Sequence, residues 1–434
     1  MPSSSKMMFA CCVVASTWTA ATADLRAASL IAARRAASGV FRPPLEEILP
    51  SAAVVVPLRA EGVPGLHGDE AFYTAEIGIG NGEERQQRFS VLFDTASGNV
   101  LLPAEGCASE ACRGKRLYFP GQSSASEVVP LEDVEKALLK SAVTSSDGLT
   151  VAATVENDSV VVEFSQLELG DGLLRGHPYR DNLCLTPDLC GGIGLLAVES
   201  YTEAPFRSMP HDGILGLSLD GLALSSPLFS TIRSLGGAGS SLFSLALRGP
   251  SAEIGFGGLS PTFTSRRPIW RPVNKLEEGY WQVKIFSVIV GNLTVHPCLE
   301  GCTGIIDTGA ARLGVPSAVM PKMVAATAVP DLPSLLNPDN NCCPGPDIHL
   351  DLGGGDYLTL PASTYAGREC NLEAPRVVPL ELGPGYEGAF VIGLSLLKHY
   401  DTIYDFGLHR LGFAAVPSGK GTSDLSGDFA QMTI

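Results

Sequence analysis

The sequence predicts a mostly β protein built from two lobes, and three observations lead to this class. The chain has 434 residues, which is too long for one ordinary hydrophobic core. It contains 48 Gly and 31 Pro but only 18% charged residues, a composition typical of strands joined by turns rather than of long helices. A short motif also occurs twice, once in each half of the chain. We therefore expect two β-rich lobes with one copy of the motif in each.

The N-terminus has the features of a secretory signal peptide. Lys6 precedes an apolar run over 7–14, and the small residues of 21–23 form an exit before Asp24. A short buried helix would contain a similar run, but the position and the flanking residues favour a signal peptide at 1–23. We therefore expect the protein to enter the secretory pathway and to be secreted or sent to an acidic vacuole or lysosome-like compartment.

Charge and hydropathy exclude two classes of partner. The formal net charge is −16, whereas a nucleic-acid-binding protein needs a basic face. Beyond the N-terminal region no stretch has about 20 consecutive apolar residues, so we expect no membrane span. These features fit a soluble mature protein, which we expect to be a monomer.

The segment 24–68 resembles a prosegment. It is rich in Ala and Arg, consists mostly of good helix formers, and ends in turn residues. Its four arginines would lie over an acidic cleft until the segment is removed; they are Arg26, Arg34, Arg35 and Arg42. A disordered linker would have the same composition, so this alternative stays open.

Two segments of the N-terminal half predict regular structure. In 71–94, two apolar or alternating runs flank Asn81-Gly82, a dipeptide typical of β-hairpins. No helix-forming segment follows the glycines, which argues against a nucleotide-binding loop. The stretch 130–143 has Leu131, Val134 and other apolar residues on one side and predicts an amphipathic helix, which packs on the N-terminal lobe or presents a surface to a partner.

The cysteines indicate disulfides rather than a metal site. Of the eleven, Cys11 and Cys12 lie in the signal region, and six others form three close pairs. Such spacings are typical of short disulfide loops in an oxidising compartment, whereas zinc sites need CxxC pairs or interleaved His, and the histidines here are scattered. The expected pairs are Cys107–Cys112, Cys184–Cys190, Cys298–Cys302, and Cys370 with one of the adjacent Cys342 and Cys343, taken as Cys343.

The repeated motif carries the functional signal. VLFDTASGNVLLP begins at Val91, and GIIDTGAARLGVP begins at Gly304; in each copy a Pro stands nine residues after the Asp. Each copy is followed much later by two apolar residues and a glycine, ending at Gly216 and at Gly393. One Asp-Thr-Gly is weak evidence, because three residues recur by chance, but paired cassettes in the same order are strong evidence.

The chain resembles the pepsin family of aspartic endopeptidases over about 72–416. Further stretches that carry the resemblance are HDGILGL, GYWQVKIFSVIVGN, the CLEGC loop before IIDTG, and HYDTIYDFGLHRLGFAAV. The resemblance implies the bilobal acid-protease fold, with a cleft between two β lobes related by an approximate two-fold axis. We place the N-terminal lobe at 69–265, the C-terminal lobe at 266–418 and a polar tail at 419–434.

The resemblance also implies that Asp94 and Asp307 form a catalytic dyad. Two carboxyl groups a few ångströms apart cannot both ionise, so they share one proton. The ionised carboxylate takes a proton from a water that attacks the peptide carbonyl, while the protonated carboxyl hydrogen-bonds the developing oxyanion. The expected substrate is a peptide or protein, and the reaction needs no cofactor and no metal.

Further residues of the two motifs support the dyad in the family. Thr95 and Thr308 link the lobes beneath the site, and Ser97 matches a hydroxyl that bonds the first carboxylate. Gly309 is the glycine of the second motif, whereas Ala310 has no hydroxyl to offer to Asp307.

Ala96 departs from the family pattern, which has glycine at this position. If the turn requires dihedral angles unfavourable to Ala, the methyl costs about 1–3 kcal/mol. Since about 1.4 kcal/mol is tenfold in rate, we expect Ala96→Gly to raise kcat/KM about tenfold.

A second departure concerns the flap, the hairpin that closes the cleft in the family. The candidate is 149–169, with a turn at Glu156-Asn157-Asp158. The position of the family's flap Tyr falls near Ala153, and that of its Trp partner falls on Leu101. Asn157-Asp158-Ser159 and Asn292-Leu293-Thr294 are also glycosylation sequons.

Two functions fit these features. Intact Asp94, Asp307 and both threonines favour an acid endopeptidase made as a zymogen. Ala96 and the altered flap favour a catalytically weakened pepsin-like fold that binds peptides or a partner.

Overall fold

We analysed a computed structural model of the chain. The residues that the structure describes are 54–62, 71–82, 86–135, 153–156, 158–166, 170–222, 241–264, 266–327, 345–365, 377–380, 382 and 386–417. Several sequence predictions therefore lie outside the described residues. They are the signal peptide, the prosegment before residue 54, the tail 419–434, the pairing of Cys343 with Cys370, and the first sequon asparagine, Asn157.

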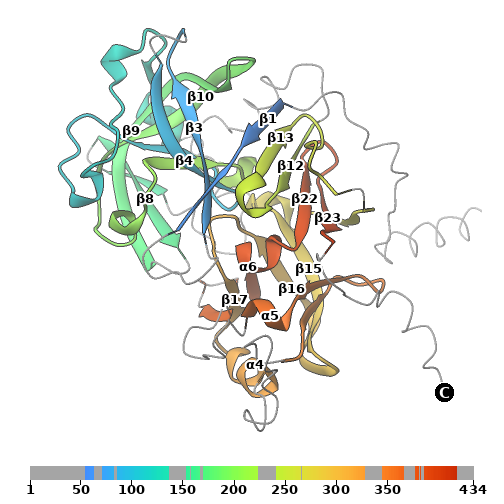
Figure 1. Ribbon diagram of the computed structural model, residues 1–434. Helices are drawn as coiled ribbons and strands as arrows, with labels where there is room; N and C mark the ends of the chain where they lie inside the picture. Colours follow the sequence, from blue (N-terminus) through green and yellow to red (C-terminus); the bar gives the residue numbers. More distant parts are fainter. Residues whose placement is uncertain are drawn as a thin grey trace, which may run out of the picture.

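The described chain is mostly β, as predicted, and forms three sheets (Figure 1). The sheet of the N-terminal half has ten strands in the order β2-β3-β4-β11-β5-β10-β9-β8-β7, with β6 paired to β9. A further pairing of β3 with β9 curls this sheet. Its strands are β2 Arg59–Glu61, β3 Phe72–Ile79, β4 Gln87–Asp94, β5 Val100–Pro103, β6 Glu127–Val128, β7 Ala153–Glu156, β8 Ser159–Gln166, β9 Gly170–Thr186, β10 Leu189–Tyr201 and β11 Gly213–Gly216.

The C-terminal half has a sheet of seven strands in the order β19-β18-β15-β16-β21-β17-β20, drawn in the lower part of Figure 1. The strands are β15 Gln282–Val290, β16 Leu293–Ile306, β17 Leu313–Pro316, β18 Ile348–Asp351, β19 Tyr357–Leu360, β20 Val377–Leu380 and β21 Ala389–Ile392. The α-helices of this half are α4 Met320–Thr327, α5 Ala362–Tyr365 and α6 Leu394–Leu397. Short 3-10 helices occupy Glu110–Cys112, Pro120–Gln122, Phe206–Ser208, Asp220–Leu222, Gly249–Ser251 and Leu276–Glu278.

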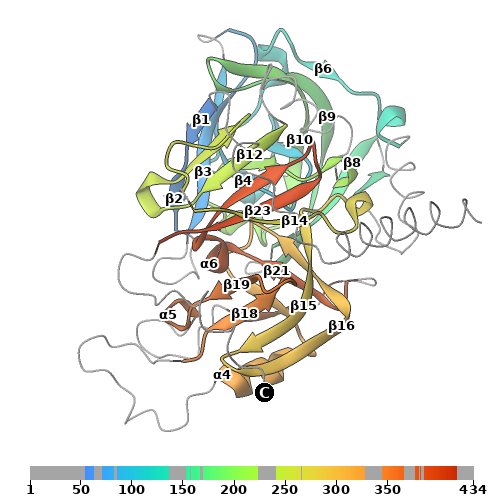
Figure 2. The same cartoon turned by 90° about the vertical axis from the view of Figure 1, so that its right-hand side faces the viewer.

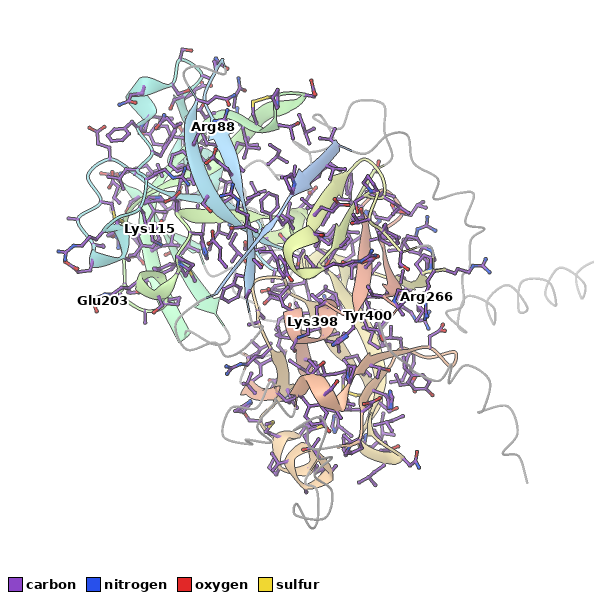
Figure 3. The ribbon with its side chains drawn as sticks, in the orientation of Figure 1. Arg88, Lys115, Glu203, Arg266, Lys398 and Tyr400 are labelled. Atoms are coloured by element: carbon purple, nitrogen blue, oxygen red, sulfur yellow. A yellow bond between two sulfur atoms is a disulfide. The ribbon has the colours of Figure 1, made fainter. Side chains whose placement is uncertain are left out.

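The third sheet takes strands from both halves and lies between the other two (Figure 2). Its order is β1-β13-β12-β22-β23-β14. The strands are β1 Val54–Pro57, β12 Leu242–Ala246, β13 Glu253–Phe256, β14 Ile269–Pro272, β22 Tyr400–Asp405 and β23 Arg410–Ala415. Because β12 pairs with β22, the last strands of the chain fasten the C-terminal half to the N-terminal half. Tyr400 of β22, labelled in Figure 3, accepts a hydrogen bond from the Thr359 N–H at 2.8 Å and so ties this sheet to β19.

Part of the predicted prosegment belongs to the folded structure. Strand β1 pairs antiparallel with β13, and β2 pairs with β3. Val56 and Leu58 bury their side chains in the main core. Since these strands lie within 24–68, the described fold begins upstream of residue 69. Whether this segment is removed stays a prediction.

The sequence repeat corresponds to a structural repeat. In the N-terminal half β11 lies between β4 and β5, parallel to the first and antiparallel to the second. In the C-terminal half β21 lies between β16 and β17 in the same way. The two apolar residues that follow each motif, ahead of a glycine, thus belong to β11 in one half and to β21 in the other, and each of these strands lies behind one Asp-Thr loop. Glycine is needed at the end of each, because a Cβ on Gly216 would be 2.4 Å from the Ser97 carbonyl oxygen and one on Gly393 would be 2.1 Å from that of Arg312.

The start of the predicted helix and the paired strands of the first hairpin lie among the described residues, whereas 136–143 of the predicted helix lie outside them. Strands β3 and β4 pair antiparallel, with Ile79 opposite Gln87, and Gly80 and Gly82 just after β3 have positive φ. Residues 131–135 are helical, and Val134 is fully buried in the main core, so this helix packs on the N-terminal half as one alternative predicted.

The flap region contains two hairpins where one was predicted. Strands β7 and β8 form the predicted hairpin, with Glu156 opposite Ser159. Strand β8 also pairs antiparallel with β9, with Gln166 opposite Gly170, which makes the second hairpin. Ala153 lies on the edge strand β7, whereas Leu101 lies on β5, with β10, β9 and β8 between them. The two positions therefore do not face each other across adjacent strands.

Three short disulfides are formed as predicted: Cys107–Cys112, Cys184–Cys190 and Cys298–Cys302. None of the helices in the described part of the chain is long and apolar enough to span a bilayer.

Candidate active site

The two Asp-Thr loops meet through a reciprocal set of hydrogen bonds. The Thr95 N–H donates to Thr308 Oγ1 at 3.0 Å, and the Thr308 N–H donates to Thr95 Oγ1 at 3.1 Å. The Thr95 hydroxyl donates to the Ile306 carbonyl at 2.8 Å, and the Thr308 hydroxyl donates to that of Phe93 at 2.6 Å. Both threonine side chains are buried. This arrangement fixes the ends of β4 and β16 against each other, and with them the aspartates that follow.

Aromatic side chains support this junction from below. Phe243 and Tyr404 of the shared sheet stack at 4.4 Å, and Trp281 packs edge-on against Tyr404 at 5.3 Å. The Trp281 indole N–H donates to the Leu217 carbonyl at 2.8 Å, which joins the C-terminal half to the residue following β11. Tyr404 is fully buried, and burial raises its pKa, with the nearby Asp307 charge acting in the same direction. The base of the site is therefore rigid and apolar.

The carboxyl groups of Asp94 and Asp307 lie together above the threonines. Asp94 Oδ1 accepts the Ala96 N–H at 2.8 Å, and Asp307 Oδ1 accepts the N–H groups of Gly309 at 2.7 Å and Ala310 at 3.1 Å. A Cβ on Gly309 would be 3.0 Å from Asp307 Oδ1 and 3.0 Å from Asp94 Oδ1, so the two carboxyl groups converge on one glycine. The sequence-predicted pair is thus brought to one place.

The environment of Asp94 favours a proton on this pair. The side chain is 5% exposed, and burial raises the pKa of Asp94 above its ordinary value of 3.8. The Ala96 N–H, the Ser97 hydroxyl and Asp307 act in the opposite direction, but burial is the larger effect. The pair can therefore hold one shared proton at acidic pH, with one carboxyl as acid and the other as base.

Comparison with known proteins agrees with this geometry. A family model described as eukaryotic aspartyl protease matches residues 72–169 and 152–416. The chain belongs to the eukaryotic aspartyl protease family.

Individual relatives are similar along most of their length. Pepsin B of Canis lupus familiaris is 27% identical over 359 residues, which cover 80% of this chain and 81% of the relative. Pepsin A of Gallus gallus is 28% identical over 356 residues, covering 80% and 84%. Gastricsin of Homo sapiens is 27% identical over 354 residues, covering 80% and 81%.

Ala96 adopts an unstrained conformation in this aspartyl protease. Among the described residues, the non-glycine residues with positive φ are Asp158, Lys275 and His409, and Ala96 is not one of them. The strain considered from the sequence is therefore absent, because the turn does not use the left-handed region at this position. The Ala96 methyl instead packs against a small apolar cluster formed by Ile305, Tyr386 and Ala389, with Tyr280 and Leu382 beside it.

Two tyrosines near the dyad were not identified from the sequence. Tyr280 packs on the same apolar cluster as Ala96; burial raises the pKa of Tyr280 to about 12, and the Asp307 and Asp94 charges add to the effect. Tyr280 packs edge-on against Tyr386 at 5.9 Å, and the Tyr386 hydroxyl donates to Glu278 Oε2 at 2.6 Å. Tyr280 stands in the GYWQ stretch, which could have drawn attention to it, whereas the sequence around Tyr386 is Gly-rich and has no recognisable signal.

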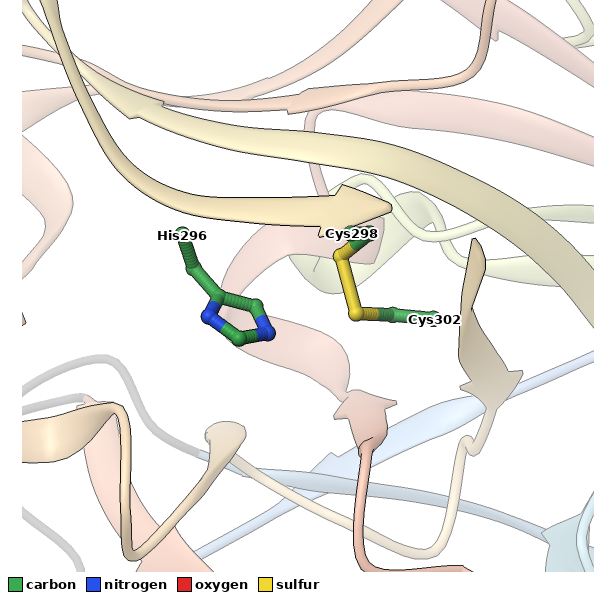
Figure 4. Close-up of side chains that lie close together, drawn as sticks. All are labelled: His296, Cys298 and Cys302. Atoms are coloured by element: carbon green, nitrogen blue, oxygen red, sulfur yellow. A yellow bond between two sulfur atoms is a disulfide. The ribbon is translucent and has the colours of Figure 1, made fainter. Parts of the chain in front are cut away.

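One group of side chains has the composition of a metal site. The ligand atoms of His296, Cys298 and Cys302 lie within 4.8 Å of one another (Figure 4). The two sulfurs are joined as a disulfide, so they are not available as thiolate ligands. In this form the group offers one imidazole.

Replacing Thr308 by Val should destabilise the protein without changing its shape. The substitution leaves the buried Phe93 carbonyl and the Thr95 N–H without their partner, at about 1–3 kcal/mol for each group. We expect a fall in Tm of several degrees, measured by calorimetry with an inhibitor absent. Thr303→Val on β16, just before the motif, is the control, since this side chain is partly exposed and the change should have little effect. Equal Tm values for the two variants would contradict the role given to Thr308.

Proposed function

We propose that the protein is an aspartic endopeptidase that hydrolyses peptide bonds through Asp94 and Asp307. The observation that carries the proposal is the convergence of the two carboxyl groups on Gly309 above the paired threonines. Family membership supports a peptide or protein substrate. The chemistry needs no covalent intermediate and no cofactor.

The arrangement supports a general acid–base reaction. The ionised carboxyl takes a proton from a water molecule, whose oxygen forms a bond to the carbonyl carbon of the peptide. The protonated carboxyl gives its proton to the carbonyl oxygen. The tetrahedral intermediate then collapses: the C–N bond breaks, the amine leaves with a proton from the dyad, and one hydroxyl of the intermediate returns its proton to the dyad as the C=O bond re-forms. The N–H groups of Ala96, Gly309 and Ala310 hold the carboxyl groups in place during these transfers.

The second candidate is a catalytically weakened pepsin-like fold that binds peptides or a partner. One of the two observations that favoured it no longer holds. The unstrained backbone of Ala96 takes away the main reason to expect a damaged site. The altered flap remains, because Leu101 stands where the family has Trp. The proposal has four further parts. The protein is made as a zymogen, enters the secretory pathway through 1–23, loses its prosegment and is a monomer.

The deciding experiment is an assay of the acid-treated full-length protein against a mixed peptide library. We expect cleavage that a statine-type inhibitor stops, because this compound mimics the tetrahedral intermediate. Tight inhibitor binding without cleavage would support the binding protein, and neither cleavage nor inhibitor binding would overturn both functions.

The raised pKa of Asp94 predicts how stability depends on pH. The folded protein keeps a proton that the unfolded chain releases above about pH 3.8, so fewer protons are bound in the unfolded state. Stability therefore falls as pH rises from 3.8 through the folded pKa, and the loss persists at neutral pH. Asp94→Asn cannot ionise, so its Tm should exceed that of the parent at about pH 7 and approach it at about pH 3.

The exposed Glu127→Gln variant is the matched control, and its Tm difference from the parent should be small and insensitive to pH. Other buried carboxyls, such as Asp401, act equally in parent and variant and cancel in the difference. A Tm of Asp94→Asn that falls below the parent as pH rises would show that the sign is wrong.

A further inference from the structure

A small polar cavity lies at the end of β11 that is remote from the dyad. His211, Asp212, Lys115 and Tyr201 line it together with apolar side chains. At the other end of β11, Gly216 pairs with Asp94, so the strand separates the cavity from the catalytic groups. The space open to the centre of a water-sized sphere is about 10 Å³, which leaves room for one water or one small ion.

His211 forms the buried wall of this cavity and lacks hydrogen-bond partners. The residue is 1% exposed, and neither of its ring nitrogens hydrogen-bonds to any described residue. A buried polar group without a partner costs about 1–3 kcal/mol, and such groups usually bind a water or an ion. Burial, reinforced by the Lys115 charge, lowers the pKa of His211 to about 3. Above about pH 3 His211 therefore lines the cavity as a neutral imidazole.

Lys115 brings a positive charge to the same cavity. Its ammonium donates to the Phe206 carbonyl at 3.2 Å and has no carboxylate within ion-pair distance among the described residues. Burial lowers the pKa of Lys115 to about 8, with Asp212 opposing the change. At acidic pH the lysine is charged, and two of its three N–H donors remain for a ligand.

The one carboxylate of the cavity is already occupied. Asp212 Oδ1 accepts the Arg116 N–H at 2.9 Å, and Oδ2 accepts the Ser90 N–H at 2.8 Å and Arg116 Nε at 2.7 Å. Arg116 also contacts the exposed Glu76 at 3.2 Å. Another charged pair, Arg207 with Glu203, is exposed, and its two charges neutralise each other; Glu203 is labelled in Figure 3. Lys115 is therefore a partly buried ammonium whose remaining N–H donors are accepted by no described group.

We propose that this cavity binds a small monovalent anion of the size of chloride between Lys115 and His211. Its size admits one such ion, and the excess of donors favours an anion over a water. Binding of the anion and protonation of His211 assist each other, because each neutralises the charge that the other brings. Affinity should therefore increase as pH falls, and occupied protein should hold a proton on His211 at a pH where empty protein does not.

Bromide is a suitable probe, because it resembles chloride and scatters X-rays anomalously. The experiment uses full-length protein with Asp307→Asn, which prevents self-cleavage. At about pH 4, about 100 mM sodium bromide should raise Tm by roughly 1–3 °C relative to sodium methanesulfonate of equal ionic strength. The shift should be less than half as large at about pH 7. Crystals grown with bromide should show an anomalous peak between Lys115 Nζ and the His211 ring.

Three variants distinguish this site from general salt effects. His211→Gln keeps hydrogen-bonding capacity but cannot take up a proton, and Lys115→Met removes the charge; each should abolish the specific bromide shift. Lys322→Met, an exposed lysine on α4, should retain the shift. An equal bromide-induced Tm shift in all variants would overturn the proposal. Crystals grown with bromide in which the cavity contains a water and no anomalous peak would overturn it as well.

Discussion

Replacing Asp307 by Ala or Asn should abolish peptidase activity while the protein stays folded. The second carboxyl is half of the proton-sharing pair, and positioned acid–base groups contribute about 10²–10⁴-fold to rate, so kcat/KM should fall at least about a thousandfold. Asp307→Asn is the sharper variant, because its side-chain oxygen can still accept the N–H groups of Gly309 and Ala310. Initial rates on a peptide identified in the library assay provide the measurement.

The integrity of the variant is checked separately. Near-ultraviolet circular dichroism should match the parent, and Tm should lie within a few degrees of it. The exposed carboxyl of Glu127 supplies a charge-matched control, Glu127→Gln, which should retain full activity. Equal turnover by Asp307→Asn and parent preparations would show that a contaminant or another site cuts the peptide.

The juxtaposition of Asp94 and Asp307 could be predicted from the sequence because its signal is local. Asp94 ends the apolar strand β4 and Asp307 directly follows the apolar strand β16; each precedes a threonine, and these neighbours recur in both halves. The short disulfides were predictable for the same reason, since each joins cysteines only a few residues apart.

Long-range pairing could not be predicted in the same way. The shared sheet depends on β12 meeting β22, with Leu245 opposite Thr402, and no local pattern specifies which distant strands pair. The inclusion of β1 in this sheet was missed for the same reason, and its segment was assigned from composition. The second hairpin escaped prediction because β8 was taken to have one partner rather than two.

The significance of Ala96 also depended on information that residue type does not contain. The glycine that the family has at this position suggests a left-handed backbone conformation, but only the structure shows whether φ is positive there. Here it is not, and the methyl is taken up by side chains that come from the other half of the chain, Tyr280 and Tyr386. His211 was likewise unremarkable in sequence, because its isolation from partners is a property of the packed interior.

Gly309 and Ala96 occupy equivalent positions in the two motifs. A methyl group at Gly309 would crowd both carboxyl groups, whereas the methyl of Ala96 packs in an apolar cluster, so we expect the second large effect from a substitution at Gly309. Gly309→Ala should lower kcat/KM by about a hundredfold, because the added methyl would be 3.0 Å from oxygens of both Asp307 and Asp94. That distance is shorter than ordinary contact, and the carboxyl groups are held by backbone N–H donors, so they must move away from their working positions. The effect should fall mainly on kcat, since the reacting atoms are displaced more than the substrate side chains.

Ala96→Gly is the matched substitution at the equivalent position of the first motif, and it should change kcat/KM by less than about threefold. The tenfold gain expected from the sequence required strain at Ala96, and the structure has none to relieve. Removal of the methyl should lower Tm slightly, because it leaves a gap beside Ile305 and Tyr386 and adds backbone freedom to the unfolded chain. Steady-state kinetics on one peptide at one acidic pH compare both variants with the parent. A gain of tenfold or more in Ala96→Gly would restore the strain hypothesis, and an active Gly309→Ala would show that the dyad tolerates a methyl that the geometry excludes.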